Sequence, residues 1–200
     1  MKSFKSNFVT IIVLLLLSFQ NVKNVAAQIN MQHESQMVQI EKLYASQQWS
    51  EIIKLEPVLL KHAEKDLNAL LILSESYAQT GNITKGNSYA EMIIAKDPSN
   101  YFAFMMLGNN SYVSKEYDQA EKYYLKVLEI RPTYARANLN LASIYEMQKK
   151  KEKAISQYFQ AIELFSANNF NNEVILYSKA VLNLDPNNTK AKSYLAITTE

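Results

Sequence analysis

The side chains that most often carry catalysis or bind metals are scarce in this sequence. It has no cysteine and only two histidines, His33 and His62. Disulfides, thiolate metal sites and thiol nucleophiles are therefore excluded, and each histidine is expected to be an ordinary surface or core residue. The sequence also has no glycine-rich phosphate loop, nucleophile elbow or metal-spaced cluster of acids. We expect a protein that is not an enzyme and that needs no cofactor or metal.

Two other groups of residues have side chains that bind ligands in some proteins. The run Lys149-Lys150-Lys151-Glu152-Lys153 resembles a phosphate-binding patch, but it falls at an expected turn, which favours a solvated loop. The 13 tyrosines have rings that stack on sugars or bases elsewhere. Most of them fall at repeated positions, where a role in the core is favoured.

The N-terminus has the pattern of a secretory signal. Lys2 and Lys5 precede an apolar run at residues 8–19, and the small residues Val25-Ala26-Ala27 follow a short polar stretch. The run has about 12 residues against the roughly 20 that span a bilayer, so an uncleaved membrane anchor is the less favoured alternative. We expect residues 1–27 to be removed and the mature protein to be exported, either periplasmic or secreted. Losing three lysines and no acid changes the formal net charge from +2 to −1, and no nucleic-acid partner is expected.

A repeat of 34 residues dominates the rest of the chain. Residues 67–100, 101–134 and 135–168 align without a gap. Position 7 is Leu in all three units, and positions 8 and 20 are always small. The aligned residues at positions 7, 8, 20 and 24 are Leu73, Leu107, Leu141; Ser74, Gly108, Ala142; Gly86, Ala120, Ala154; and Ala90, Tyr124, Tyr158.

Each unit reads as two helices joined by a short break. Apolar residues recur at helical spacing in both halves, and the sequence has only three glycines and four prolines, which favours long helices. Asp97-Pro98 and Asp185-Pro186 are expected to end helices, since proline lacks the amide proton. We expect the two helices to cross closely, with Gly108 facing Ala120, because backbone approach requires small residues on both sides.

The pattern resembles the tetratricopeptide repeat (TPR) family, whose unit carries Trp-x2-Leu-Gly-x2-Tyr, then Ala-x3-Phe, then Pro. Ser111 replaces the second aromatic residue in the best unit, where the matching residues are Phe104, Leu107, Gly108, Ala120, Tyr124 and Pro132. The resemblance implies an all-α fold, a right-handed α-solenoid of antiparallel helix hairpins that forms a TPR-like superhelix. The first helices would line a concave groove and the second helices the outside.

Both flanks of the three units are less regular. Residues 28–66 are expected to form a degenerate hairpin or cap, because Trp49 and Ile52 fall in register with the repeat while Pro57 falls where a helix interior is expected. Residues 169–200 are expected to form a C-terminal hairpin or a partial repeat. Residues 170–184 end like a second helix, whereas strict counting makes them a first helix, and Leu195-Ala196 resembles the start of another unit.

The TPR resemblance implies that the first helices present a protein-binding groove, with Phe102 and Arg136 at its edge. TPR proteins that clamp a C-terminal carboxylate use Lys and Asn one turn apart; here Asn109 fits, but Met105 stands where Lys would be. An apolar peptide or helix is therefore the favoured ligand. The expected groove residues are Leu71, Glu75, Phe102, Met105, Asn109, Tyr112, Arg136, Leu139, Ser143 and Met147.

The favoured function is an exported, non-catalytic TPR scaffold or adaptor that binds a protein or peptide partner. One alternative is a self-associating structural subunit of a cell-envelope assembly, which makes a homo-oligomer an open possibility. A carbohydrate-binding module or an enzyme is less favoured, since neither a cluster of acids nor a set of exposed aromatic residues is evident. Membrane contact is expected only through the signal segment, if it is not cleaved.

Overall fold

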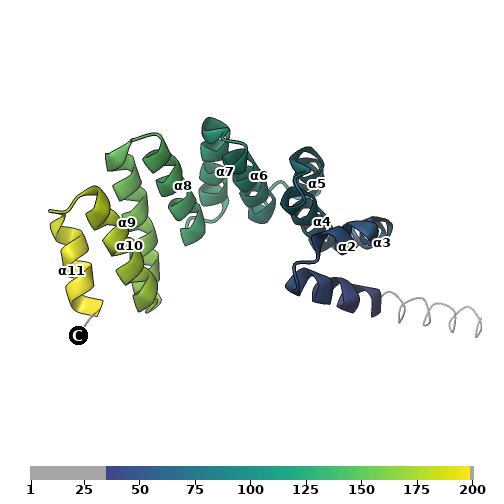
Figure 1. The fold of residues 1–200 in the computed structure, drawn as a ribbon, viewed down its shortest axis with the longest axis horizontal. Helices are drawn as coiled ribbons and strands as arrows, with labels where there is room; N and C mark the ends of the chain where they lie inside the picture. Colours follow the sequence, from purple (N-terminus) through teal and green to yellow (C-terminus); the bar gives the residue numbers. More distant parts are fainter. Residues whose placement is uncertain (1–34, 199–200) are drawn as a thin grey trace, which may run out of the picture. The chain divides into compact units, whose positions relative to one another are not determined.

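The computed structural model describes residues 35–198, and this part of the chain is helical throughout, without a strand. The expected fold class is confirmed: the chain is an α-solenoid of antiparallel helix hairpins (Figure 1). The predicted signal segment, residues 1–27, and His33 lie outside the described residues. The chain divides into two compact units, with the boundary between Val58 and Leu59.

The N-terminal unit contains a helix over residues 35–45, α2 (Trp49–Lys54) and the first residues of α3 (Glu56–His62). Tyr44 and Trp49 meet edge to face across the turn, with ring centroids 5.3 Å apart. Pro57 does not interrupt a helix, because α2 ends before it and α3 begins at Glu56. Proline is tolerated in the first turn of a helix, where the amide proton has no partner within the helix.

The second unit begins within α3 and contains eight further helices in its described residues, and consecutive helices lie side by side (Figure 1). We call the helices of a hairpin its first and second helix. The bounds are α4 (Asn68–Gln79), α5 (Ile83–Lys96), α6 (Tyr101–Val113), α7 (Tyr117–Ile130), α8 (Ala135–Met147), α9 (Lys151–Ala167), α10 (Asn171–Leu184) and α11 (Thr189–Thr198).

An inner turn, which joins the two helices of one hairpin, has the same backbone form each time. One residue has a positive φ, and the next donates its N–H to the carbonyl five residues earlier. Glu116 N, for example, lies 2.8 Å from Ser111 O. The positive-φ residues of this kind in the second unit are Gly81 (88°), Lys115 (63°), Lys149 (57°) and Asn169 (59°).

An outer turn joins one hairpin to the next, and the outer turns before α6 and α11 use an aspartate and an asparagine three residues apart, whereas the one before α8 has Arg131 and Tyr134 there. Asn100 caps α6, since its Oδ1 accepts from the Ala103 N–H at 3.3 Å, and its Nδ2 donates to Asp97 Oδ2 at 3.2 Å. Asn188 and Asp185 repeat this arrangement before α11, with the Asn188 Oδ1 3.1 Å from the N–H nitrogen of Ala191. A side-chain oxygen at the N-cap satisfies a backbone donor that has no partner within the helix.

The two kinds of turn identify α10 as a second helix. The turn before it, with Asn169 at positive φ, is an inner turn, and the turn after it, from Asp185, is an outer turn. Val174 is buried five residues after Asn169, as Ala120 is buried five residues after Lys115. Strict counting in steps of 34 residues would instead make α10 a first helix.

As a result, α9 serves two hairpins at once. It packs against α8 as a second helix and against α10 as a first helix. Tyr158 illustrates both roles, because its hydroxyl donates to Glu146 on α8 while its ring stacks with Tyr177 on α10, at a centroid distance of 6.0 Å. The repeat frame therefore shifts within α9.

The close crossing expected at positions 8 and 20 is present in the α4–α5 hairpin. A Cβ added to Gly86 would lie 2.8 Å from Ser74 O, and the Ser74 hydroxyl donates to the Gly86 carbonyl at 2.8 Å. In the α6–α7 hairpin the expectation was wrong in detail. Gly108 makes room for the Tyr124 ring, whose Cε1 would lie 2.5 Å from an added Cβ, rather than for the Ala120 backbone.

Candidate protein-binding surface

The residues expected to bind a partner lie on the first helices α4, α6 and α8. We define the first-helix face as five exposed side chains on two first helices: Phe102, Asn109 and Val113 of α6, and Arg136 and Met147 of α8. Phe102 is 46% exposed and Met147 is 57% exposed, while Asn109 and Arg136 are also exposed. The half-buried members of the expected set are Leu71, Glu75, Tyr112, Leu139 and Ser143.

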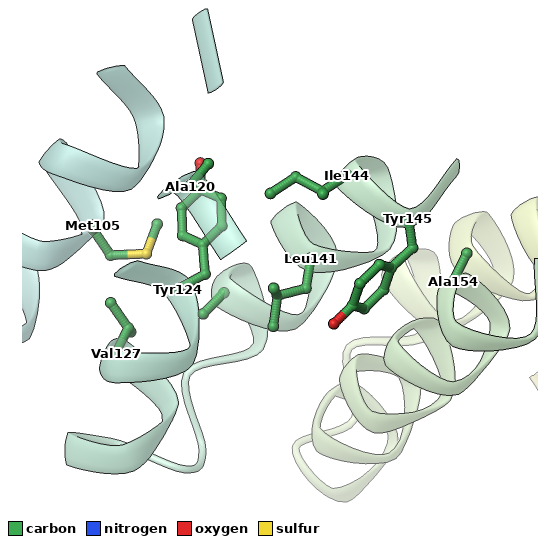
Figure 2. Packing of buried hydrophobic residues seen from close by; sticks show 9 residues of the cluster. Met105, Ala120, Tyr124, Val127, Leu141, Ile144, Tyr145 and Ala154 are labelled. Carbon is green, nitrogen blue, oxygen red and sulfur yellow. The ribbon is translucent and has the colours of Figure 1, made fainter. Parts of the chain in front are cut away.

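Met105 is a correction, because it was expected in the groove but is only 4% exposed. Its side chain packs in the same cluster as Tyr124 and Val127 of α7 (Figure 2). Position 5 of α6 therefore faces the core, one helical step away from the exposed residues. Replacing Met105 would test packing, not partner binding.

Val113 belongs to the first-helix face although the sequence reasoning missed it. It is 69% exposed at the end of α6, and it occupies the same repeat position as Met147 on α8. The signal was its spacing, since Val113 follows Asn109 by four residues and so shares its side of the helix.

Phe102 sits in an aromatic cluster at the start of α6. Its ring centroid lies 4.1 Å from that of Tyr101 and 6.4 Å from that of Tyr134. The Arg131 guanidinium lies 4.8 Å from the Tyr101 ring centroid and donates a hydrogen bond to the Tyr101 hydroxyl. These contacts hold the Phe102 ring in place while nearly half of its surface is exposed, which suits an anchor for an apolar side chain.

The side-chain oxygen of Asn109, the residue expected in a carboxylate clamp, makes hydrogen bonds within the fold. Its Oδ1 accepts from the Tyr124 hydroxyl at 2.9 Å and from Asn140 Nδ2 at 3.1 Å. The amide thus joins α6 to α7 and to α8. A clamp needs this residue together with a cation one turn earlier, and Met105 supplies no cation.

Buried tyrosine hydroxyls make further links between helices. Tyr145 on α8 donates to Glu121 on α7 at 2.7 Å. Burial, together with this bond to a carboxylate, raises the pKa of Tyr145 to about 12. Burial also raises the pKa values of Tyr124 and Tyr158. All three are neutral donors near pH 7, which supports the structural role expected for the tyrosines.

The lysine run lies at the inner turn between α8 and α9, where it was expected, and its lysines are exposed. The Lys153 Nζ lies 5.1 Å from the Tyr145 ring centroid. Within residues 35–198 no group of three His, Asp or Glu side chains is arranged to hold a metal ion. None of the described helices is long and apolar enough to cross a membrane.

Comparisons with known proteins agree with this architecture. Residues 105–169 match the tetratricopeptide repeat family model. The fold is that of tetratricopeptide repeat proteins. The TPR match ends at residue 169, close to the place where the repeat frame shifts. A search of curated proteins gave no significant match.

Solved TPR structures cover most of the chain at low identity. The crystal structure of MamA superimposes with a TM-score of 0.62 at 18% identity, covering 80% of this chain and 92% of that one. A thermophilic TPR protein from Thermus thermophilus gives 0.57 at 17%, covering 84% and 98%. The C-terminal part of a TPR protein from Cytophaga hutchinsonii gives 0.52 at 22%, covering 70% and 65%. At these identities the likeness shows the fold alone.

Proposed function

We propose that this TPR protein is an exported, non-catalytic scaffold that binds a protein or peptide partner on its first-helix face. The observation that carries the proposal is the exposure of three large apolar side chains on two adjacent first helices: Phe102, Val113 and Met147. Exposed apolar residues gathered on one face of a solenoid are typical of interaction surfaces. TPR folds in general serve as protein-interaction scaffolds.

The chemistry of the face favours an apolar segment as the partner. Methionine adapts its shape to different contacts, and a phenylalanine held by neighbouring rings loses little entropy on binding. Asn109 lies between Phe102 and Val113 along α6; its Oδ1 is already bonded within the fold, so its Nδ2 is the group that it offers to a peptide backbone. Arg136 is the exposed cation at position 2 of α8, where it favours an acidic residue next to the apolar ones.

The test is partner capture by a double variant, Phe102→Ser with Met147→Ser. Both side chains are about half exposed, so the fold should tolerate both changes. The mature protein is crosslinked in a cell-envelope extract, and retained proteins are identified by mass spectrometry. The matched control is Met92→Ser with Leu125→Ser, since these apolar residues are similarly exposed but lie on second helices. Equal loss in both variants, or no loss in either, would remove the first-helix face as the binding site.

Export rests on the sequence pattern at residues 1–27, namely lysines before an apolar run and small residues after it. The proposal is cleavage after Ala27 and release outside the cytoplasm. Intact-mass measurement on protein from the native host decides this, because a species that begins at residue 28 is expected. A cytoplasmic species that retains Met1 would contradict it.

A self-associating structural subunit is the second candidate, and the C-terminal helices favour it. Phe170, Leu176 and Ile197 are all more than half exposed, at 53%, 58% and 73%. Measuring the molar mass of the mature protein by light scattering tests this function. A monomer at all concentrations would exclude it, and a dimer that Leu176→Ser dissociates would establish it.

A further inference from the structure

The third hairpin departs from the repeat at position 4. The first two units place a large apolar residue there, Leu70 in α4 and Phe104 in α6, whereas α8 has Asn138. Asn138 is nevertheless only 2% exposed. A small amide thus replaces a large apolar side chain at a buried position, and such an exchange leaves unfilled space unless the neighbours collapse onto it.

A surface pocket of about 300 Å³ lies at this point. This volume is at the lower end of the range for small-molecule sites, which is roughly 300 to 1,000 Å³. None of its residues belongs to the first-helix face. The pocket lies between α8, the second half of α9 and the outer turn before α8, and it is lined by Pro132, Asn138, Gln160, Glu163 and Leu164.

Asn138 has a hydrogen-bonding capacity that the fold leaves unused. Its Oδ1 is buried and has no hydrogen-bond partner within the described residues. An unsatisfied buried acceptor is unfavourable for folding. The two ends of an amide exchange places by rotation about the last side-chain bond, for which the barrier is low and the preferred angles are broad. The amide can therefore turn its oxygen toward a donor that enters the pocket.

The other polar groups of the pocket are also acceptors or neutral amides. The Glu163 carboxylate lies on its wall and receives Lys190 Nζ at 2.7 Å through Oε1, which leaves Oε2 as an acceptor. None of the five lining residues is cationic. Leu164 and Pro132 supply apolar surface, against which an alkyl stem packs while its charged head meets the acceptors.

We propose that this pocket binds a cation carried on an alkyl stem, either a guanidinium or an ammonium group. The head donates to Glu163 Oε2 and to the Asn138 oxygen, and the stem lies along Leu164. Two sources share this chemistry: an Arg or Lys side chain of a partner peptide, and a free aliphatic amine. The proposal does not depend on the function of the first-helix face, because it uses none of its residues.

The test is titration of the isotope-labelled full chain, followed by the side-chain amide signals of Asn138 and Gln160. The probes are N-acetylarginine amide, its neutral isostere N-acetylcitrulline amide, and putrescine. We expect saturable shifts with the cations and at least tenfold weaker binding of the citrulline compound. Tighter binding of arginine amide identifies a peptide side chain as the source, and tighter binding of putrescine identifies a free amine. No saturable shift with either cation, or equal binding of citrulline, overturns the proposal.

Variants separate this site from unspecific attraction of cations. Asn138→Leu restores the apolar residue of the repeat, so it should keep the fold and abolish the shifts at Gln160. Glu163→Gln should weaken cation binding about tenfold, since it removes the charge-assisted hydrogen bond. Its control is Glu129→Gln, because Glu129 is the same repeat position of α7 and is paired with Lys126 at 2.7 Å. Unchanged binding in Asn138→Leu, or equal weakening in both glutamine variants, contradicts the assignment.

Discussion

The ring of Tyr124 lies directly over the backbone of Gly108, so that an added Cβ would be 2.5 Å from Cε1 and 2.8 Å from Cδ1. The ring has no room to move away, because Tyr124 is buried and its hydroxyl is bonded to Asn109. Glycine at this position is thus a requirement of packing and not of backbone conformation. The α6–α7 hairpin depends on this contact.

Gly108→Ala should lower the free energy of unfolding. Overpacking against a fixed ring costs about 1–3 kcal/mol, and the better helix propensity of alanine returns at most about 1 kcal/mol. Chemical denaturation of the full chain measures the difference. Lys122→Ala, on the exposed side of α7, is the control and should change the stability by less than about 0.5 kcal/mol. If the two variants are equally stable, the Tyr124 ring can move away from the added methyl group, and the packing requirement at Gly108 is contradicted.

Lys149→Gly should stabilise the protein. Lys149 has φ of 57° at the inner turn before α9, and this left-handed conformation costs a non-glycine residue about 1–2 kcal/mol. Glycine avoids that cost, although its larger entropy in the unfolded chain returns about 0.4–1 kcal/mol. From these two effects we expect the free energy of unfolding to rise by about 0.5–1 kcal/mol. Thermal or chemical unfolding measures it.

The control for this change is Lys122→Gly, where the same substitution falls inside α7. It should cost about 1 kcal/mol, because glycine is a poor helix former. Gly81→Ala tests the converse at the inner turn before α5, where φ is 88°. It should be destabilising although an added Cβ meets nothing within 4 Å. If Lys149→Gly loses stability as Lys122→Gly does, backbone strain is not what matters at that turn.

The stability of the fold should fall at alkaline pH. The pKa of Tyr145 is raised from 10.0 to about 12 in the folded protein, so the unfolded chain loses this proton first as the pH rises. The stabilisation is fully present below about pH 10 and is lost between about pH 10 and 12. Urea midpoints across this range, with tyrosinate absorbance, measure the effect. Tyr145→Phe should reduce the slope, and an unchanged slope would assign the pH dependence to other tyrosines.

Arg136 should affect the association rate of the partner more than the equilibrium affinity. It is exposed at position 2 of α8. A charge at such a position attracts a diffusing partner, but dissolved salt screens it. Once a partner has been captured, Arg136→Ala should reduce the association rate several-fold at low salt and little at physiological salt. Surface plasmon resonance at two ionic strengths measures this. An equal reduction at both would indicate that Arg136 is a buried anchor in the complex.

The sequence was sufficient for the fold class because the small and apolar positions recur every 34 residues through residue 168. It predicted small residues at positions 8 and 20, but not that Gly108 accommodates a ring and Gly86 a backbone carbonyl. Position 24 is Tyr124 in one hairpin and Ala90 in the other, but its size alone does not decide the contact, because Tyr158 of the third hairpin lies in one buried cluster with Ala142, which has a Cβ. The prediction that Met105 lies in the groove was wrong, because core and surface positions on α6 differ by one helical step.

The candidate surface was only partly predictable for a similar reason. The exposure of Phe102 and Met147 follows from helical spacing, whereas the pocket at Asn138 depends on how far α9 extends beside α8. The frame shift in α9 could have been predicted from Asn168-Asn169, because Asn169 is the positive-φ residue of one more inner turn, as Lys149 is of the inner turn before it. Exported location and partner binding at the first-helix face stay predictions.

A helix shared by two hairpins changes how the C-terminal end of the chain should open and close. In an ordinary repeat array each hairpin meets the next across an interface, so terminal hairpins can fray separately. Here the α8–α9 and α9–α10 hairpins have no interface between them that could separate, because α9 belongs to both. When the stability of the protein is changed, the rates of amide hydrogen exchange in α10 and in α8 should therefore change together, as in one cooperative unit. A force applied to the chain after α10 would be transmitted through α9 to α8 without an intervening break.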